Sequence, residues 1–159
     1  MKKYLFFLIA FILLGKATQA QDYRGSLGFR ISGFNSNGLT GKLFILPDKA
    51  IEGILAARWR GMHIAGLYEI HAPAFNVTGL TWYYGPGMHI ATWKDTSKNP
   101  WWDDDVNHTV IGVDGIIGIE YTFGEIPFNL SLDFKPAFHI IGHFGFWYDE
   151  LAVSIRYVF

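Results

Sequence analysis

The sequence predicts an all-β protein, an eight-stranded antiparallel up-and-down transmembrane β-barrel, and three observations support this fold class. Apolar and polar residues alternate with a period of two along several segments, as expected for strands with one lipid face and one lumen face. No apolar run long enough for a transmembrane helix follows residue 20. Aromatic residues make up 18% of the chain, which also has 18 glycines, and this suits barrels because aromatics line the membrane interfaces.

The first twenty residues predict a cleaved signal peptide. Lys2 and Lys3 form a positive start, and residues 4–14 form an apolar run too short to span a bilayer. Residues 18–20 end in the small Ala20, after which we expect cleavage, with an uncleaved anchor as the alternative. Residues 21–159 then form a single domain, because no repeat, low-complexity segment or linker divides them.

The charge of the expected mature chain excludes one class of partner. Removing Lys2, Lys3 and Lys16 lowers Lys+Arg from 13 to 10 while Asp+Glu stays at 14, which gives a net charge of −4. Such a chain is not expected to bind nucleic acid. The sequence has no cysteine, which excludes a disulfide scaffold and a lipid-modified cysteine.

The strands follow one another with short connections. In the first, the apolar residues Leu27, Phe29 and Ile31 alternate with polar ones. The second to fifth strands are separated by turns such as 46–50 and 72–79. The expected strands are 25–33, 38–46, 51–60, 62–71, 80–92, 110–123, 127–139 and 150–159.

The alternation is clearest in the last three strands. In the seventh, Phe128, Leu130, Leu132 and Phe134 share one face; polar residues that include Asp133 and Lys135 share the other. The sixth strand and the last, 151–159, repeat this pattern. Pro86 and Pro136 lie inside expected strands, and because proline cannot donate a ladder hydrogen bond, a bulge is predicted at each.

Volume decides which face points outward. A soluble lipocalin-like barrel would place its apolar face inside, and an eight-stranded barrel holds only its own packed side chains or one small ligand. The apolar face here carries many large residues, including Trp59, Trp82 and Tyr84, and the other face carries Gly, Ala, Ser, Thr and charged residues. The apolar face is therefore expected to meet lipid.

The connections predict an orientation. If both termini are periplasmic, the connections at 46–50, 72–79 and 124–127 are periplasmic as well, and such turns tend to be short. The longest connection, 93–109, would then be an outer loop. Aromatic residues of the outward face gather near the periplasmic end, where they would form an interfacial girdle. They are Tyr68, Trp82, Tyr121, Phe123, Phe128, Tyr157 and Phe159.

All charges within the strands are expected to project into the lumen. Buried charges are tolerated only when they are paired and hydrogen-bonded, so an internal ion network that plugs the lumen is predicted. A gated pore or a paired-carboxylate acid/base site is the alternative, although no spacing singles out a reacting pair. The residues are Arg30, Lys42, Glu52, Arg58, Arg60, Glu69, Asp114, Glu120, Asp133, Lys135 and Arg156.

Histidines gather at the expected outer mouth. Imidazole and carboxylate groups together could bind a transition metal, although no H-E-x-x-H or H-x-x-E-H motif is present. Interfacial and loop histidines near lipid headgroups are the alternative. The candidate metal ligands are His63, His89, His139 and His143.

The outer loop 94–108 combines Trp101 and Trp102 with Asp103, Asp104 and Asp105. These five residues are candidates for contact with a partner, a glycan or a cation. The tryptophans could equally rest in the headgroup zone, which is the usual interfacial preference of tryptophan.

The whole mature chain resembles known families. The alternating strands and the terminal residues 154–159 resemble the small OmpA/OmpX-type outer-membrane barrels, and Tyr157 with Phe159 resembles the signal read by the outer-membrane assembly machinery. Segments 50–55, 66–69, 112–121 and 126–136 resemble an uncharacterised family of small Gram-negative outer-membrane β-barrel proteins. These resemblances imply a fold and a location, and no activity.

The sequence thus predicts an integral outer-membrane protein of a Gram-negative bacterium, with a structural or interaction role through its outer loops. We expect a monomer that contacts outer-membrane lipid and lipopolysaccharide and uses no cofactor. The alternatives are a barrel enzyme acting on lipid or lipopolysaccharide, and metal capture at the outer mouth. A lipid A palmitoyl-transfer barrel is similar in size but has an additional N-terminal amphipathic helix, and here only residues 21–24 precede the first strand. No G-x-S-x-G motif is present.

Overall fold

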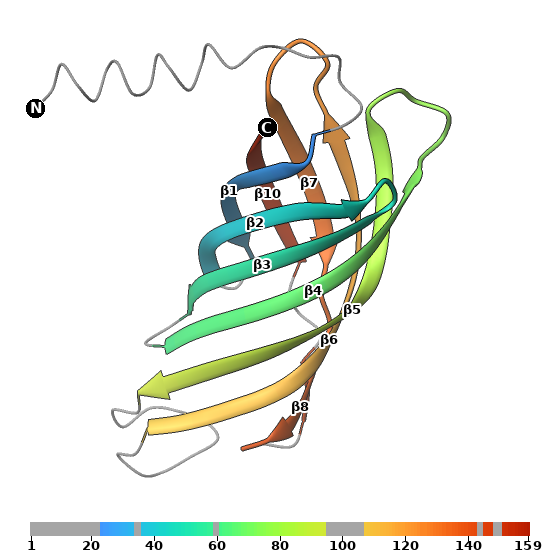
Figure 1. Ribbon diagram of the computed structural model, residues 1–159. Helices are drawn as coiled ribbons and strands as arrows, with labels where there is room; N and C mark the ends of the chain where they lie inside the picture. The colour runs from blue at the N-terminus through green and yellow to red at the C-terminus, as the bar shows by residue number, and fades with distance from the viewer. Residues whose placement is uncertain (1–22, 34–35, 59–60, 95–106, 143–144, 148–150) are drawn as a thin grey trace, which may run out of the picture.

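The computed structural model describes residues 23–33, 36–58, 61–94, 107–142, 145–147 and 151–159. The expected signal peptide, residues 1–20, lies outside these ranges. The described residues form ten strand segments that close into a barrel (Figure 1). Their bounds are β1 Gly25–Ser32, β2 Ser36–Leu46, β3 Lys49–Arg58, β4 Gly61–Pro73, β5 Leu80–Lys94, β6 Asn107–Thr122, β7 Phe128–Phe134, β8 Ala137–Ile141, β9 Gly145–Trp147 and β10 Leu151–Val158.

The ten segments make eight barrel strands. β7 and β8 together form the seventh, since both pair with β6. β9 and β10 form the eighth, since β9 pairs with β8 and β10 pairs with β7. Every pairing is antiparallel, and β1 pairs with β10 to close the ring. The predicted fold class, an eight-stranded antiparallel barrel, is confirmed. None of the described residues belongs to a helix long and apolar enough to cross a membrane.

The two ends of the barrel differ. Tyr23 and Phe159 lie at the same end as the β2–β3, β4–β5 and β6–β7 turns, at the top of Figure 1. We call this the terminal end and the opposite one the distal end. The grouping of the three turns with the termini matches the grouping expected from the sequence.

The predicted bulge at Pro86 is wrong, whereas at Pro136 the register shifts on one side of the strand. Pro86 pairs with Gly115 in a β5–β6 register that runs without a shift from Leu80 to Lys94. Pro136 separates β7 from β8, and the register with β6 is the same on both sides of it. The register with the eighth strand differs by one residue, from Phe134 opposite Leu151 to Ala137 opposite Trp147. Relative to β6, the shift on β8 comes later, between the pairs at Gly112 and Ile111. A proline can occupy a strand without a bulge where the position lacks a ladder hydrogen bond, and β4 indeed has no paired residue opposite Pro86.

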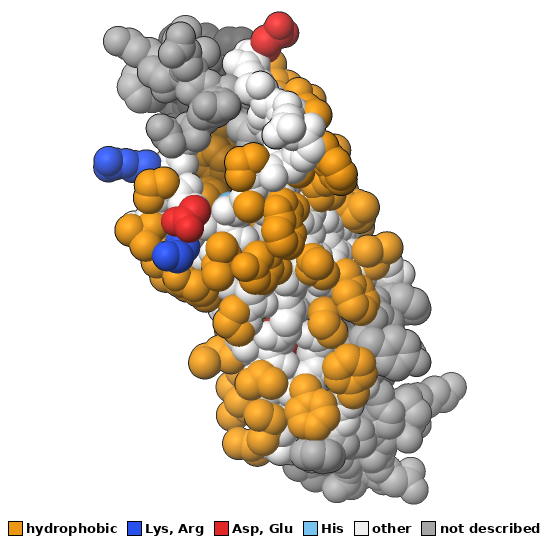
Figure 2. All heavy atoms as spheres, turned by 90° about the vertical axis from the view of Figure 1, so that its right-hand side faces the viewer, with side chains coloured by type: hydrophobic (Ala, Val, Ile, Leu, Met, Phe, Trp, Pro, Cys, Tyr) orange, Lys and Arg blue, Asp and Glu red, His pale blue; other side chains and the backbone are white. Residues whose placement is uncertain are grey.

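The register with β6 does not shift at either proline, which keeps the alternation of side chains in β5 and in the seventh strand intact. Inward positions of β5 remain inward beyond Pro86, so His89 is buried, and His139 is buried beyond Pro136. The outward face is apolar along its length; in β1, for example, Leu27, Phe29 and Ile31 are 60%, 64% and 62% exposed. Figure 2 shows apolar side chains over most of one face of the barrel, with the few charged ones confined to its upper part.

Candidate functional site

The barrel interior contains a cluster of charged side chains drawn from all around the wall. Each of its seven charged residues is at most 2% exposed, and each comes from a different strand segment. Tyr83 of β5 joins them, so all eight barrel strands contribute a side chain. We call this set the central ion cluster. Its charged members are Arg30, Lys42, Glu52, Glu69, Glu120, Asp133 and Arg156.

Lys42 of β2 is the hub of this cluster on one side. Its Nζ lies 2.8 Å from a carboxylate oxygen of Glu69 and 2.9 Å from one of Glu120. Glu52, its cross-strand neighbour on β3, is 3.7 Å away. The ammonium also lies 4.1 Å from the centre of the Tyr83 ring. The ammonium group of Lys42 thus lies close to three carboxylates and to one aromatic face.

Arg156 of β10, which is separated from β2 by β1, contacts two of the same carboxylates. Its Nη2 donates to Glu52 at 2.6 Å, and its Nη1 donates to the Ser131 hydroxyl at 2.8 Å and lies 3.7 Å from Glu120. Thr40 accepts from Arg156 Nε at 3.3 Å and donates its own hydroxyl to Glu52. The neutral hydroxyls of Thr40 and Ser131 therefore accept hydrogen bonds from Arg156, and the Thr40 hydroxyl also donates to Glu52.

Arg30 and Asp133 form a separate pair within the cluster. Arg30 donates from both terminal nitrogens, at 2.7 and 2.6 Å, to the two oxygens of Asp133. This bidentate geometry is the strong form of the arginine–carboxylate pair. The Tyr83 hydroxyl also donates to Asp133, at 3.0 Å. A Cβ on Gly118 would lie 2.6 Å from the Tyr83 ring, so the glycine leaves the space that the ring occupies.

Polar residues at the terminal end extend the cluster. The Tyr23 hydroxyl donates to Glu120 at 2.5 Å and accepts from Asn129 at 3.0 Å. Burial, and next the negative charge of Glu120, raise the pKa of Tyr23 above its ordinary value, so the hydroxyl keeps its proton. His71 Nε2 lies 3.0 Å from Glu69. A cavity of about 1050 Å³ opens at this end, and Tyr23, His71 and Glu120 are among the residues that line it.

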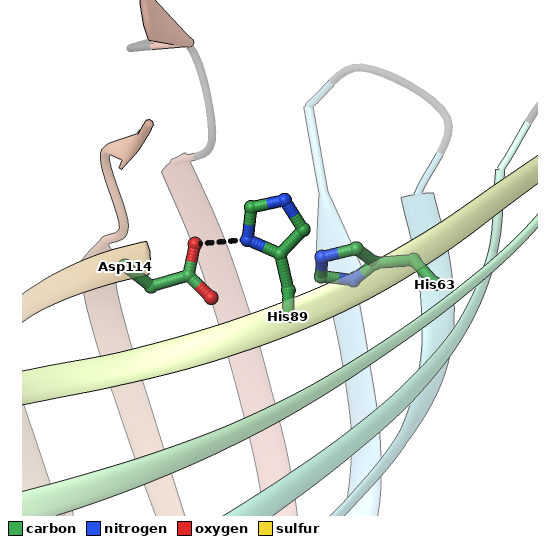
Figure 3. Close-up of side chains that lie close together, drawn as sticks. All are labelled: His63, His89 and Asp114. Atoms are coloured by element: carbon green, nitrogen blue, oxygen red, sulfur yellow. Dashed lines mark hydrogen bonds and ion pairs between the residues drawn. The ribbon is translucent and has the colours of Figure 1, made fainter. Parts of the chain in front are cut away.

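A second polar cluster lies nearer the distal end and contains three histidines. His63 of β4, His89 of β5 and Asp114 of β6 each offer a ligand atom, and these three atoms lie within 4.8 Å of one another. His89 Nδ1 is 2.7 Å from Asp114 Oδ1. Figure 3 shows His63 and Asp114 approaching His89 from its two sides. We call these three residues, with His139 of β8, the distal histidine cluster.

The register explains why these side chains meet. Gly112 of β6 pairs with His89 on one side and with His139 on the other. A Cβ at Gly112 would lie 2.5 Å from His89 Cε1, so this glycine makes room for the rings. The His89 ring centre is 5.1 Å from that of His139 and 5.3 Å from that of His63. The ammonium group of Lys135 also lies near this cluster, with its Nζ 3.7 Å from Asp114 Oδ1.

The predicted lumen residues thus divide between the two clusters. Seven of those named from the sequence lie in the central ion cluster, whereas Asp114 and Lys135 lie with the histidines. Several predictions fall outside the described part of the chain. They are those for the side chain of Arg58 and for Arg60, His143, Trp101, Trp102, Asp103, Asp104 and Asp105.

Sequence reasoning missed four side chains that contact the central ion cluster. Tyr83 shares its parity with Gly85, Gly87 and His89, so the alternation already placed it inward. Thr40 and Ser131 were recognisable only as small polar lumen residues, because nothing in their spacing identifies a guanidinium partner. Tyr23 precedes β1 and therefore has no alternation from which its direction could be deduced.

Comparison with known proteins supports the fold alone. The crystal structure of the N-terminal β-barrel domain of Pseudomonas aeruginosa OprF matches with a TM-score of 0.68 and 14% sequence identity, covering 85% of this chain and 96% of that one. No family model and no curated protein matches the sequence. The likeness to the OprF domain agrees with the strand pairing, and the chain has the fold of a closed eight-stranded antiparallel β-barrel.

Proposed function

We propose that this protein is an integral outer-membrane β-barrel whose lumen is closed by the central ion cluster, with a structural role or an interaction role through its outer loops. One observation carries the proposal: the barrel is apolar outside and charged inside. The side chains that a soluble protein would bury are exposed, and those that it would expose are buried.

The exposed apolar surface supports membrane insertion. Monomeric soluble proteins rarely expose a continuous apolar patch larger than a few hundred Å². Here large apolar side chains are exposed on all eight barrel strands, from Leu27 on β1 to Ile155 on β10. Strands of about ten residues at the usual tilt give an apolar band about 25 Å tall. Lipid satisfies this surface all around the barrel, which one protein partner could not do.

The backbone supports the same conclusion. In lipid every backbone polar group must find a partner within the protein, and among strand architectures only a closed barrel provides this, since it has no free edge. The pairings of β1 with β10 and of β5 with β6 remove the two edges that an open sheet would have. Bacterial membrane barrels of this kind belong to the outer membrane, which is the location we propose, together with export through a cleaved signal peptide and delivery by the assembly machinery.

Ion pairing supports a closed lumen. Side chains from all eight barrel strands meet in the central ion cluster, where three cations face four carboxylates. An ion that crossed the lumen would have to separate pairs such as Arg30–Asp133 at 2.6 Å and Lys42–Glu69 at 2.8 Å. In the narrow interior of an eight-stranded barrel, the wall side chains themselves fill the cross-section.

Two measurements test the proposal. The folded protein in lipid vesicles should resist extraction by alkaline carbonate, and its gel mobility should change on heating; release of a folded, soluble protein would refute the membrane assignment. In planar bilayers the wild type should give no steady channels. The variant Arg30→Ser/Asp133→Ser removes one ion pair without changing the net charge, and we expect it to conduct. Steady channels from the wild type would refute the closed lumen and leave the membrane assignment standing.

A further inference from the structure

We propose that His63, His89 and Asp114 bind one divalent transition-metal ion of the zinc type inside the distal part of the barrel. The inference goes beyond the proposed function and does not depend on membrane insertion. It rests on three observations: ligand atoms of the right chemistry lie together, the residues that carry them are buried, and an oxygen atom of Asp114 lacks a hydrogen-bond partner.

The chemistry of the ligand set selects the class of ion. Two imidazoles and a carboxylate suit zinc, copper or nickel, whereas calcium and magnesium prefer sets composed of oxygen atoms. The three ligand atoms lie within 4.8 Å of one another. Zinc binds imidazole nitrogen at about 2.0–2.1 Å, so the side chains would move inward by less than the length of one covalent bond. His139 stands beside His89, with ring centres 5.1 Å apart, and could supply a fourth ligand.

The hydrogen bond between His89 and Asp114 holds two ligand atoms side by side. A carboxylate has no proton to give, so at 2.7 Å His89 Nδ1 is the donor and Asp114 Oδ1 the acceptor. If the ring proton moves to Nε2, the lone pair of Nδ1 becomes free. A metal ion would then take the place of the proton between His89 Nδ1 and Asp114, with both residues as ligands.

Two atoms of this cluster lack the partners that burial requires. His89 Nε2 and Asp114 Oδ2 are both buried and accept no hydrogen bond. Buried polar atoms are nearly always paired, and Asp114 Oδ2 is an electron-pair donor of the kind that a metal ion would take. His71 shows the contrast: this buried histidine at the other end also contacts a carboxylate, at 3.0 Å from Glu69, but the described residues place no second imidazole next to it.

The positive charge of Lys135 lies close enough to Asp114 to oppose the binding of a metal ion. Its Nζ lies 3.7 Å from Asp114 Oδ1, so Asp114 already has a cation nearby and a metal must compete with it. Removal of this positive charge should therefore strengthen binding. The variant Lys135→Met gives the proposal a test in which affinity rises, an outcome that damage to the fold does not produce.

The experiment is a zinc titration of the tag-free barrel folded in detergent micelles. The metal is added either after folding or during it, so that slow entry into the lumen does not hide the site. We expect one Zn²⁺ per chain by calorimetry, no heat with Mg²⁺, and a higher temperature for the heat-induced change in gel mobility when Zn²⁺ is bound. Asp114→Asn removes the charge of one ligand and should weaken binding by at least about 10-fold, since even the loss of a partner of a ligand has an effect of that size.

The variants separate this site from adventitious binding. His63→Ala/His89→Ala should abolish the saturable heat and the thermal shift, Lys135→Met should increase affinity, and the matched control His71→Asn should leave both readouts unchanged. Gel mobility before and after heating reports whether each variant is folded. Absence of zinc binding under both loading conditions would overturn the proposal, as would binding that survives in the folded double variant.

Discussion

The central ion cluster predicts a large penalty for removing its hub cation. Lys42→Met keeps the length of the side chain but removes the ammonium that lies 2.8 and 2.9 Å from Glu69 and Glu120. The cluster then has two cations, Arg30 and Arg156, against four carboxylates, and its formal charge changes from −1 to −2. Removing one partner of a buried pair typically costs about 3–5 kcal/mol, because the remaining charge stays buried without compensation.

A charge-balanced partner variant isolates the electrostatic part of this loss. Lys42→Met/Glu69→Gln restores the formal charge to −1, and glutamine keeps an oxygen for the contact with His71. We expect the double variant to be more stable than Lys42→Met alone, since the uncompensated charge has gone. Lys49→Met, at the half-buried start of β3, is the matched control, and its effect should stay within about 0.5 kcal/mol.

The assay is equilibrium unfolding by urea in lipid vesicles, followed by tryptophan fluorescence and by the fraction of unheated protein that keeps the mobility of the folded form on a gel. Free energies of unfolding come from linear extrapolation. The reasoning fails if Lys42→Met is as stable as the wild type, or if adding Glu69→Gln lowers the stability further. Either result would mean that the four carboxylates do not depend on Lys42 for their compensation.

Three further predictions use the same assay. Leu132→Arg, at a position 47% exposed on β7, should cost about 2–4 kcal/mol if that face meets the lipid midplane but less than about 0.5 kcal/mol if it meets water; the small value would contradict the membrane assignment. Gly118→Ala should cost about 1–3 kcal/mol by overpacking, since its Cβ would lie 2.6 Å from the Tyr83 ring; an unchanged unfolding midpoint would show that the ring moves freely. Tyr23→Phe should lower stability by a constant amount below about pH 10, the pKa of an unfolded tyrosine, and by less above it, because the raised pKa of Tyr23 lets only the unfolded state ionise there; a difference that grows above pH 10 would contradict this sign.

The sequence predicts the barrel well because one physical rule operates along its whole length. In a strand with lipid on one side and a narrow lumen on the other, size and polarity must alternate, so Phe29 and Arg30 could be assigned to opposite faces from their neighbours alone. The prediction of a bulge at Pro86 is wrong for the opposite reason. Proline removes one hydrogen-bond donor, but whether the ladder then shifts depends on the facing strand, and Pro86 keeps its place opposite Gly115.

The partners within the lumen could not be predicted in the same way. Alternation fixes a side chain's direction but not its height relative to strands distant in the sequence, which depends on the stagger of the whole barrel. Arg30 and Asp133 are 103 residues apart, and nothing local identifies them as a pair. The distal histidine cluster depends on register too: His89 and His139 meet across Gly112 only because neither proline shifts its strand relative to β6.

The charged lumen also accounts for the uniqueness of this register. Side chains alternate with a period of two, so a slip of one residue in any strand would exchange its two faces. For β10 such a slip would move Arg156 from the lumen to the outer face, where an arginine at the midplane of a membrane costs about 2–4 kcal/mol, and would leave Glu52 without the guanidinium now 2.6 Å away. An apolar lumen of the same volume would be at least as stable in the correct register, but it would not oppose the slip. Because all eight barrel strands contribute to the central ion cluster, a slip of any one strand would separate its side chain from partners on the other strands. We infer that so many charges are buried because they make the strand pairing specific.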